Sequence, residues 1–125
     1  MRRRNKYNAK KTIVDGIKFD SKMEAERYAE LKLMQKAGQI VGLEVHPRYP
    51  IFIGKHHICV YEADFSYIDP LAKMIVEDVK GVRTALFILK KKLMLAIHGI
   101  EVKEIKAKKR GVWKDFKEKV IDANR

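Results

Sequence analysis

The sequence predicts one domain of the α/β or α+β class, built around a small mixed β-sheet. The chain has 125 residues, of which 46% are apolar, which is enough for one hydrophobic core and too short for two. The spacing of apolar residues changes along the chain between the alternation of strands and the period of about 3.6 residues of helices. No internal repeat or low-complexity tract interrupts this pattern.

The chain begins with a basic segment and a tight turn. Residues 1–11 hold several Arg and Lys side chains and almost no apolar ones, which is typical of a flexible arm. Within 12–19, Asp15-Gly16 lies between apolar residues, a pattern that favours a β-hairpin. We therefore expect the folded part to begin near Thr12.

A helix is predicted over residues 22–37. Asp20 or Ser21 can act as the N-cap, and Glu24 follows Ser21 at the spacing of a capping box. Gly38 follows the last apolar position and suits the C-terminal end of the helix.

Three extended segments follow the helix. Residues 43–53 contain two prolines, which remove backbone donors, so this segment is predicted to be an edge strand or an interrupted strand. Residues 57–68 and 74–80 are rich in β-branched and aromatic types and flank a turn that begins at Asp69-Pro70. These two segments predict an antiparallel hairpin.

A second helix, a last strand and a tail complete the prediction. The apolar run 84–97, closed by Gly99, indicates a helix, and the alternation over 100–105 indicates a strand. A basic link over 106–110 then precedes a short amphipathic helix. Its apolar stripe is expected to consist of Trp113, Phe116, Val120 and Ile121. The expected parts are a flexible basic arm over 1–11, the main domain over 12–106 and a basic helical extension over 107–125.

The charge of the chain indicates a polyanionic partner. Lys and Arg number 28 against 16 Asp and Glu, which gives a formal net charge of +12. Such an excess attracts nucleic acid, and the affinity for nucleic acid should fall steeply with salt. No apolar run approaches the roughly 20 residues of a membrane span, and no signal-peptide pattern is present. The expected location is therefore the cytoplasm, with no membrane partner.

Cysteine and histidine usage argues against a zinc site. Cys59 is the only cysteine, which excludes an intramolecular disulfide and a thiolate zinc cluster. The four histidines do not fall at the spacing of helical or finger-like metal sites.

Two aspartates are expected to face each other in the central hairpin. If Ile68 pairs with Met74, the antiparallel register places Asp64 opposite Asp78, with Cβ atoms roughly 5 Å apart. Two facing carboxylates without histidine or thiolate suit a hard cation such as Mg²⁺. Lys80 lies on the same face, where it can orient a nucleophile or stabilise charge that develops at phosphorus. The alternative is that both acids are ordinary solvent-facing residues paired with lysines.

Other acids near these strands are ranked by the face on which they lie. Glu24 falls on the apolar stripe of the first helix, whereas Glu26 and Glu30 fall on its solvated side. A buried carboxylate needs a partner, which is either the metal centre or the capping box with Ser21. Glu77 falls on the face of its strand opposite the predicted site, so it is the poorer ligand.

These residues resemble a known nuclease superfamily. Asp64 followed by Asp78-Val79-Lys80 is similar to the signature of the PD-(D/E)XK nucleases, with Ala63 in place of the proline. Over residues 6–106 the chain is similar to a phage and prophage family of that superfamily. The similar segments are 6–11, 15–22, 24–28, 63–65 and 76–81.

The resemblance implies a restriction-endonuclease-like αβββαβ core, with a small mixed sheet flanked by helices. Asp64, Asp78 and the Val79 carbonyl would bind Mg²⁺ or Mn²⁺. Lys80 would assist the attacking water, and Glu24 would be the acid carried by the helix. A glutamine would be expected where this sequence has His46.

Compact phage nucleases of this superfamily include Holliday-junction resolvases, which act as two-fold dimers. By analogy we expect a homodimeric, structure-selective DNA endonuclease that serves phage recombination, replication or packaging in the host cytoplasm. Phage replication or packaging proteins are further expected partners. The alternatives are a non-catalytic DNA-binding protein, a nuclease of single-stranded DNA or RNA, and an accessory protein.

Backbone phosphates are expected to be bound by basic residues of the arm, the strands, the second helix and the tail. A side chain of this kind, taken alone, is more often simply a solvated surface residue. They are Arg2, Arg3, Arg4, Lys10, Lys11, Arg48, Arg83, Lys90, Lys91, Lys92, Lys108, Lys109 and Arg110.

Overall fold

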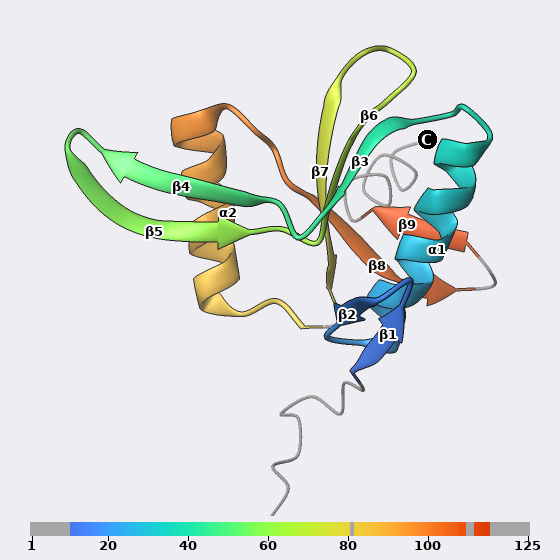
Figure 1. Ribbon diagram of the computed structural model, residues 1–125. Coiled ribbons are helices and arrows are strands. Elements are labelled where there is room, and N and C mark those ends of the chain that lie inside the picture. The colour runs from blue at the N-terminus through green and yellow to red at the C-terminus, as the bar shows by residue number, and fades with distance from the viewer. Residues whose placement is uncertain (1–10, 81, 110–111, 116–125) are drawn as a thin grey trace, which may run out of the picture.

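The structure is a computed structural model that describes residues 11–80, 82–109 and 112–115 (Figure 1). Its elements, in chain order, are β1 (Thr12–Val14), β2 (Ile17–Phe19), α1 (Lys22–Lys36), β3 (Val41–Val45), β4 (Arg48–Ile53), β5 (His56–Glu62), β6 (Phe65–Ile68), β7 (Met74–Lys80), α2 (Ala85–His98), β8 (Lys103–Lys109) and β9 (Val112–Asp115).

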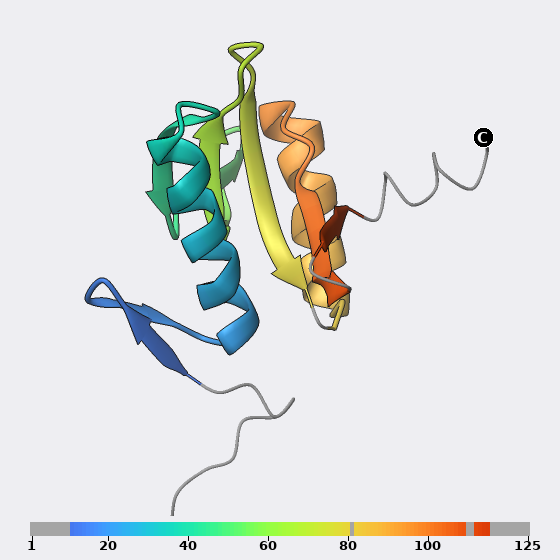
Figure 2. The same ribbon diagram turned by 90° about the vertical axis from the view of Figure 1, so that its right-hand side faces the viewer.

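A five-stranded mixed sheet lies between the two helices. Its strand order is β3-β6-β7-β8-β9, in which β7 and β8 are parallel and the other neighbours are antiparallel. Figure 2 shows α1 on one side of the sheet and α2 on the other. The chain order α1, β3, β6, β7, α2, β8 is the predicted αβββαβ order, with the hairpin β4–β5 inserted after β3. The predicted mixed α/β class is confirmed.

Helix α1 forms where its capping signals predict it. The Ser21 hydroxyl accepts a hydrogen bond from the Glu24 amide at 3.1 Å, which satisfies one of the free donors of the first turn. Gly38 has a φ of +78°, a conformation that glycine adopts without strain, and it ends the helix. Tyr28 and Leu31 are buried in the apolar core between α1 and the sheet. The predicted burial of the Glu24 stripe is therefore confirmed.

Helix α2 covers the other side of the sheet together with the hairpin β4–β5. It begins at the N-cap Thr84 and ends at Gly99, which is left-handed. Phe87 and Met94 are buried in a second core, where they join residues of β4, β5 and β7. The site described below lies at the edge of this core.

The predicted single strand over 57–68 is wrong, because the chain bends between β5 and β6. Val45 pairs with Phe65 and Arg48 pairs with Glu62, so one antiparallel ribbon continues through the bend in an unchanged register. On one side of the bend the ribbon belongs to the central sheet, and on the other side it packs over α2 (Figure 1). His46 has a φ of +55° and allows the chain to turn there.

The predicted helix around Trp113 is also wrong. Strand β8 continues to Lys109, and Trp113 lies in β9, where Ile105 pairs with Asp115. Val112 and Trp113 are types that favour strands, and pairing with an open sheet edge outweighs a weak helical period. The sheet therefore extends past the predicted domain end at 106. The other three residues of the predicted stripe lie outside the described residues.

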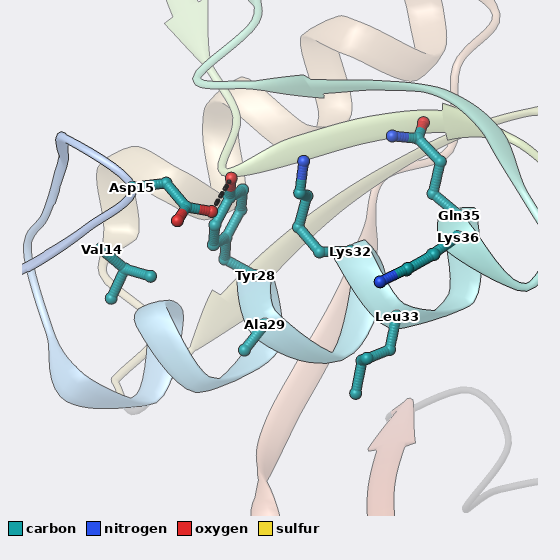
Figure 3. A pocket seen from close by; sticks show the side chains of 8 residues that line it. All are labelled: Val14, Asp15, Tyr28, Ala29, Lys32, Leu33, Gln35 and Lys36. Carbon is teal, nitrogen blue, oxygen red and sulfur yellow. Dashed lines mark hydrogen bonds between the residues drawn. The ribbon is translucent and has the colours of Figure 1, made fainter.

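The hairpin β1–β2 packs against α1, and its Phe19 is buried in the core between α1 and the sheet. The Tyr28 hydroxyl donates a hydrogen bond to an Asp15 carboxylate oxygen at 2.9 Å, which ties the hairpin turn to the helix (Figure 3). A hollow of about 480 Å³ lies between these elements, and none of the predicted catalytic residues lines it. None of the described helices has the length and apolar composition that a membrane crossing requires.

Candidate active site

Asp64 and Asp78 are locked together at the start of β6 and the end of β7. Ile68 pairs with Met74, so the predicted register is confirmed. The Asp64 amide donates to one Asp78 carboxylate oxygen at 3.0 Å, and the Val79 amide donates to an Asp64 carboxylate oxygen at 2.7 Å. Each carboxylate thus accepts a backbone hydrogen bond from the neighbouring strand. The bend before β6 brings Asp64 to this position.

Asp78 and Lys80 contact each other and are fixed by two neighbours, Tyr61 and Phe87. The Tyr61 hydroxyl donates a hydrogen bond to Asp78 Oδ2. Lys80 Nζ lies 3.8 Å from the same oxygen and 4.1 Å from the centroid of the Phe87 ring. The ammonium is therefore held between a carboxylate and an aromatic face, both of which attract a cation.

The electrostatics of the site oppose two ionised carboxylates. Burial raises the pKa of Asp64 well above its usual value, and the charges of Asp78 and Glu24 raise it further. Burial also raises the pKa of Asp78, whereas Lys80 and the Tyr61 hydroxyl lower it. In the absence of a cation, the pair would hold its protons more tightly than ordinary aspartates do.

Glu24 approaches the same group of acids from α1. It is 4% exposed, and its carboxylate lies 2.7 Å from His46 Nε2. Burial raises the pKa of Glu24, and the hydrogen bond and charge of His46 lower it. The His46 amide also donates to the Asp64 carbonyl at 2.9 Å. His46 therefore connects the helix-borne acid to the bend that carries Asp64.

The chemistry of the donors suits a hard divalent cation. Asp64 and Asp78 offer carboxylate oxygens, and Val79 would add a carbonyl oxygen, a set that Mg²⁺ and Mn²⁺ prefer over zinc. Among the described residues, no three His, Cys, Asp or Glu side chains gather as a complete metal cage. Such a set is sufficient for Mg²⁺, which usually takes one or two carboxylates and completes its shell with water and substrate phosphate.

Two of the predicted phosphate-binding residues are organised by a buried acid. Glu104, 3% exposed, pairs with Asp78 across β7 and β8. Its carboxylate lies 2.5 Å from Arg83 Nε and 2.6 Å from Lys91 Nζ. The structure therefore places Arg83 and Lys91 together, one strand away from the acidic pair.

The other predicted DNA-binding residues are more widely spread. Lys90 Nζ donates to the Val60 carbonyl at 3.1 Å, so this lysine holds the hairpin rather than projecting freely. Lys11, Arg48 and Lys92 are exposed. The predicted residues that lie outside the described parts are Arg2, Arg3, Arg4, Lys10 and Arg110. Lys108 and Lys109 lie in β8, and their side chains are likewise outside the description.

We expect replacement of Glu104 by glutamine to destabilise the fold. The change removes the negative charge between Arg83 and Lys91 and leaves two cations facing each other, at a cost of about 1–3 kcal/mol. Urea unfolding of both proteins measures the difference. An unchanged free energy of unfolding would show that the two cations do not need this partner. Glu26→Gln, which changes an exposed acid of α1, is the matched control.

Tyr61, His46 and Phe87 complete the site, and the sequence did not identify them as site residues. Uninterrupted alternation through 57–68 would place Tyr61 on the face opposite Asp64. The bend at Asp64 removes that constraint and lets the hydroxyl reach Asp78. The length of the predicted strand indicates that it is interrupted, because a strand of twelve residues is far longer than the typical five or six.

Comparison with known proteins gives a family and no activity. Residues 4–119 match the family described as "Protein of unknown function (DUF1064)", a range that includes every candidate catalytic residue. No curated protein and no solved structure matches the chain.

Proposed function

Because the chain belongs to the DUF1064 family, whose description names no activity, we propose from its site that it is a metal-dependent DNA endonuclease of the PD-(D/E)XK type. The observation that carries this proposal is the reciprocal locking of Asp64 and Asp78, with Lys80 Nζ 3.8 Å from Asp78. Two buried, like-charged carboxylates in fixed positions are costly to a fold and useful to a cation site.

A divalent cation held by Asp64, Asp78 and the Val79 carbonyl would supply a Lewis acid for the phosphodiester. The protein contributes position and charge. The backbone amides of Asp64 and Val79 hold the two carboxylates in fixed orientations, so little reorganisation is needed during the reaction. Tyr61 restrains Asp78 from the side of the hairpin.

Lys80 is the cationic group best placed to act on the substrate. Its ammonium, held beside Asp78 and over the Phe87 ring, would donate hydrogen bonds to the attacking water or to a non-bridging phosphate oxygen. Charge that develops at phosphorus would then be stabilised by a group already in place. Glu24 is the further acid of this cluster. Its carboxylate, held in place by His46, would polarise or orient water.

The substrate that the charge favours is DNA. A net charge of +12 supplies long-range attraction, and the pair formed by Arg83 and Lys91 offers two cations near the site. We propose selectivity for branched DNA, such as a Holliday junction, and action as a homodimer in the host cytoplasm on phage DNA. Partner proteins of phage replication or packaging belong to the same proposal.

Cleavage of a panel of labelled nucleic acids tests this function. Four-way junction, flap, duplex and single-stranded DNA and a matched RNA are incubated with the protein in Mg²⁺, Mn²⁺ or EDTA. The proposal predicts metal-dependent internal cleavage that is fastest on a branched DNA. Preference for RNA or free single-stranded ends would favour the alternative nuclease class. Tight DNA binding with no cleavage in any metal would favour a non-catalytic DNA-binding protein.

Replacing Lys80 by methionine is expected to lower the cleavage rate by about 100- to 1000-fold. The methionine fills a similar space over Phe87 but cannot donate a hydrogen bond or carry charge. Single-turnover rates and Mg²⁺ titration calorimetry measure the two consequences separately. Metal binding should persist in the variant, because the lysine is not a ligand. A wild-type rate in Lys80→Met would remove Lys80 from the mechanism.

A further inference from the structure

The outer half of the hairpin β4–β5 exposes apolar side chains on both faces. Phe52, Ile53 and Ile58 are 47%, 56% and 49% exposed. The Phe52 and His57 rings lie 5.1 Å apart, so they form an aromatic pair near the turn. In the view of Figure 1 the hairpin projects to the left of the central sheet.

The inner half of the same hairpin is firmly attached to α2. His98 Nε2 lies 2.8 Å from the Pro50 carbonyl oxygen, and Lys90 Nζ donates to the Val60 carbonyl. Ile51 is fully buried in the core beneath. Beyond this point the register shifts by one residue. Ile51 pairs with Cys59, whereas Phe52 pairs with His57, so Ile58 has no partner in the register. Such a bulge changes the direction of the side chains that follow it. The hairpin is therefore a supported arm with an apolar tip.

The charge of the arm distinguishes between two occupants of this tip. Residues 49–61 contain Lys55, His56 and His57 and no acidic residue. A two-fold contact with a second copy would bring two Lys55 ammonium groups to the same interface with no acidic residue of the arm to pair with them, which like charges disfavour. A nucleic acid offers phosphates to the basic groups and base faces to the exposed rings.

We propose that the tip of β4–β5 is a DNA wedge that recognises unpaired bases, a specificity element that rests on the proposed function. Phe52 would stack on an unpaired base at a branch, with Ile53 and Ile58 against the neighbouring bases. Lys55 would bind a phosphate. The tip accounts for structure selectivity without a base-reading module.

The arm has the reach that this role requires. Phe52 lies opposite His57 in the ribbon, and His57 precedes Asp64 by seven residues in the chain. Seven strand residues span at most about 23 Å. This length corresponds to roughly seven base pairs of duplex. The same DNA molecule can therefore contact both the tip and the acidic pair.

Binding in EDTA tests the wedge without any need for cleavage. The probes are a flap and a four-way junction with 2-aminopurine at the unpaired position, and a fully paired duplex of the same length. The proteins are wild type, Phe52→Ala, Phe52→Trp and Lys55→Ala, with Leu71→Ala as control. Leu71 is 87% exposed in the turn between β6 and β7, at the ends of these strands remote from Asp64.

The wedge predicts that Phe52→Ala binds the branched probes roughly fivefold or more weakly, since stacking on a base contributes at least about 1 kcal/mol. Duplex affinity should change by less than about twofold, and the fluorescence change of 2-aminopurine should be lost. Phe52→Trp should retain branch binding, Lys55→Ala should weaken all probes similarly, and Leu71→Ala should behave as wild type. Circular dichroism checks that each variant is folded.

Three results would overturn the inference. The first is a Phe52→Ala protein that binds the branched probes as tightly as wild type does. The second is a wild type that binds branched probes and duplex equally well. The third is a Phe52→Ala protein that sediments as a monomer where the wild type sediments as a dimer. The last result would assign the tip to a second copy of the chain. A wild type that shows the expected binding but never cuts DNA would refute the nuclease and leave the wedge intact.

Discussion

Replacement of Asp64 by asparagine is expected to stabilise the metal-free protein and to abolish both cleavage and stabilisation by Mg²⁺. Asparagine keeps an oxygen that can accept the hydrogen bond from the Val79 amide. It removes a buried charge that faces Asp78 and Glu24. A gain of about 1–2 kcal/mol in the free energy of unfolding is expected at neutral pH, as is common when a strained functional site is relaxed.

The pH dependence of this gain follows from the raised pKa of Asp64. A carboxyl group whose pKa is higher in the folded than in the unfolded protein favours folding at low pH. That contribution is lost as the pH rises through the folded-state pKa. The stability difference between Asp64→Asn and wild type should therefore shrink as the pH falls below that pKa.

Urea unfolding in EDTA and in millimolar Mg²⁺ measures these effects. Wild type should gain about 2.7 kcal/mol when the metal concentration is about 100 times its Kd, and Asp64→Asn should gain none. Glu26→Gln, an exposed acid on α1, serves as the control and should follow wild type. An Asp64→Asn protein that is less stable than wild type in EDTA at neutral pH would contradict this account of the site.

Replacement of Arg27 by methionine is expected to cost about 3–5 kcal/mol of stability, the range for breaking a buried ion pair. Arg27 Nε and Nη2 donate to the two Glu77 carboxylate oxygens at 2.6 and 3.0 Å, and the Tyr67 hydroxyl donates to Glu77 at 2.7 Å. Glu77 is fully buried. Without the guanidinium, a buried carboxylate would keep only the tyrosine as its partner.

A double-mutant cycle separates the ion pair from the loss of packing. Arg27→Met, Glu77→Met and the double variant are compared with wild type by urea unfolding. The double variant should be more stable than the sum of the two single losses predicts, because neither buried charge remains. Arg27→Lys should restore little, since an ammonium cannot replace the two-pronged contact. Single losses below about 1 kcal/mol would contradict a structural role for the pair.

The sequence predicts the central hairpin well because side-chain alternation and turn length together define one register. The pairing of Ile68 with Met74 follows from the turn, and the proximity of Asp64 and Asp78 follows from the pairing. The opposite orientation of Glu77 follows from the same alternation. Both helices are likewise predicted by their caps and by glycines at their ends.

The features that the sequence does not predict depend on contacts between distant segments. The bend at Ala63 and Asp64 is held by hydrogen bonds to Pro47 and His46, which connect β3 to β4 on the other side of the ribbon. Strand β9 forms because β8 offers a free edge, a feature that no local pattern in the tail records. Glu77 can be buried because Arg27 of α1 faces it and pairs with its carboxylate, a contact between segments 50 residues apart in the chain.

Cleavage of branched DNA by wild type and Asp78→Asn, purified side by side and assayed in Mg²⁺ or EDTA, tests the central claim most directly. The account predicts cleavage by wild type in Mg²⁺ only, and a rate at least about 100-fold lower in Asp78→Asn, which retains DNA binding. Equal cleavage by both proteins would contradict the assignment of Asp64, Asp78 and Lys80 as the active site.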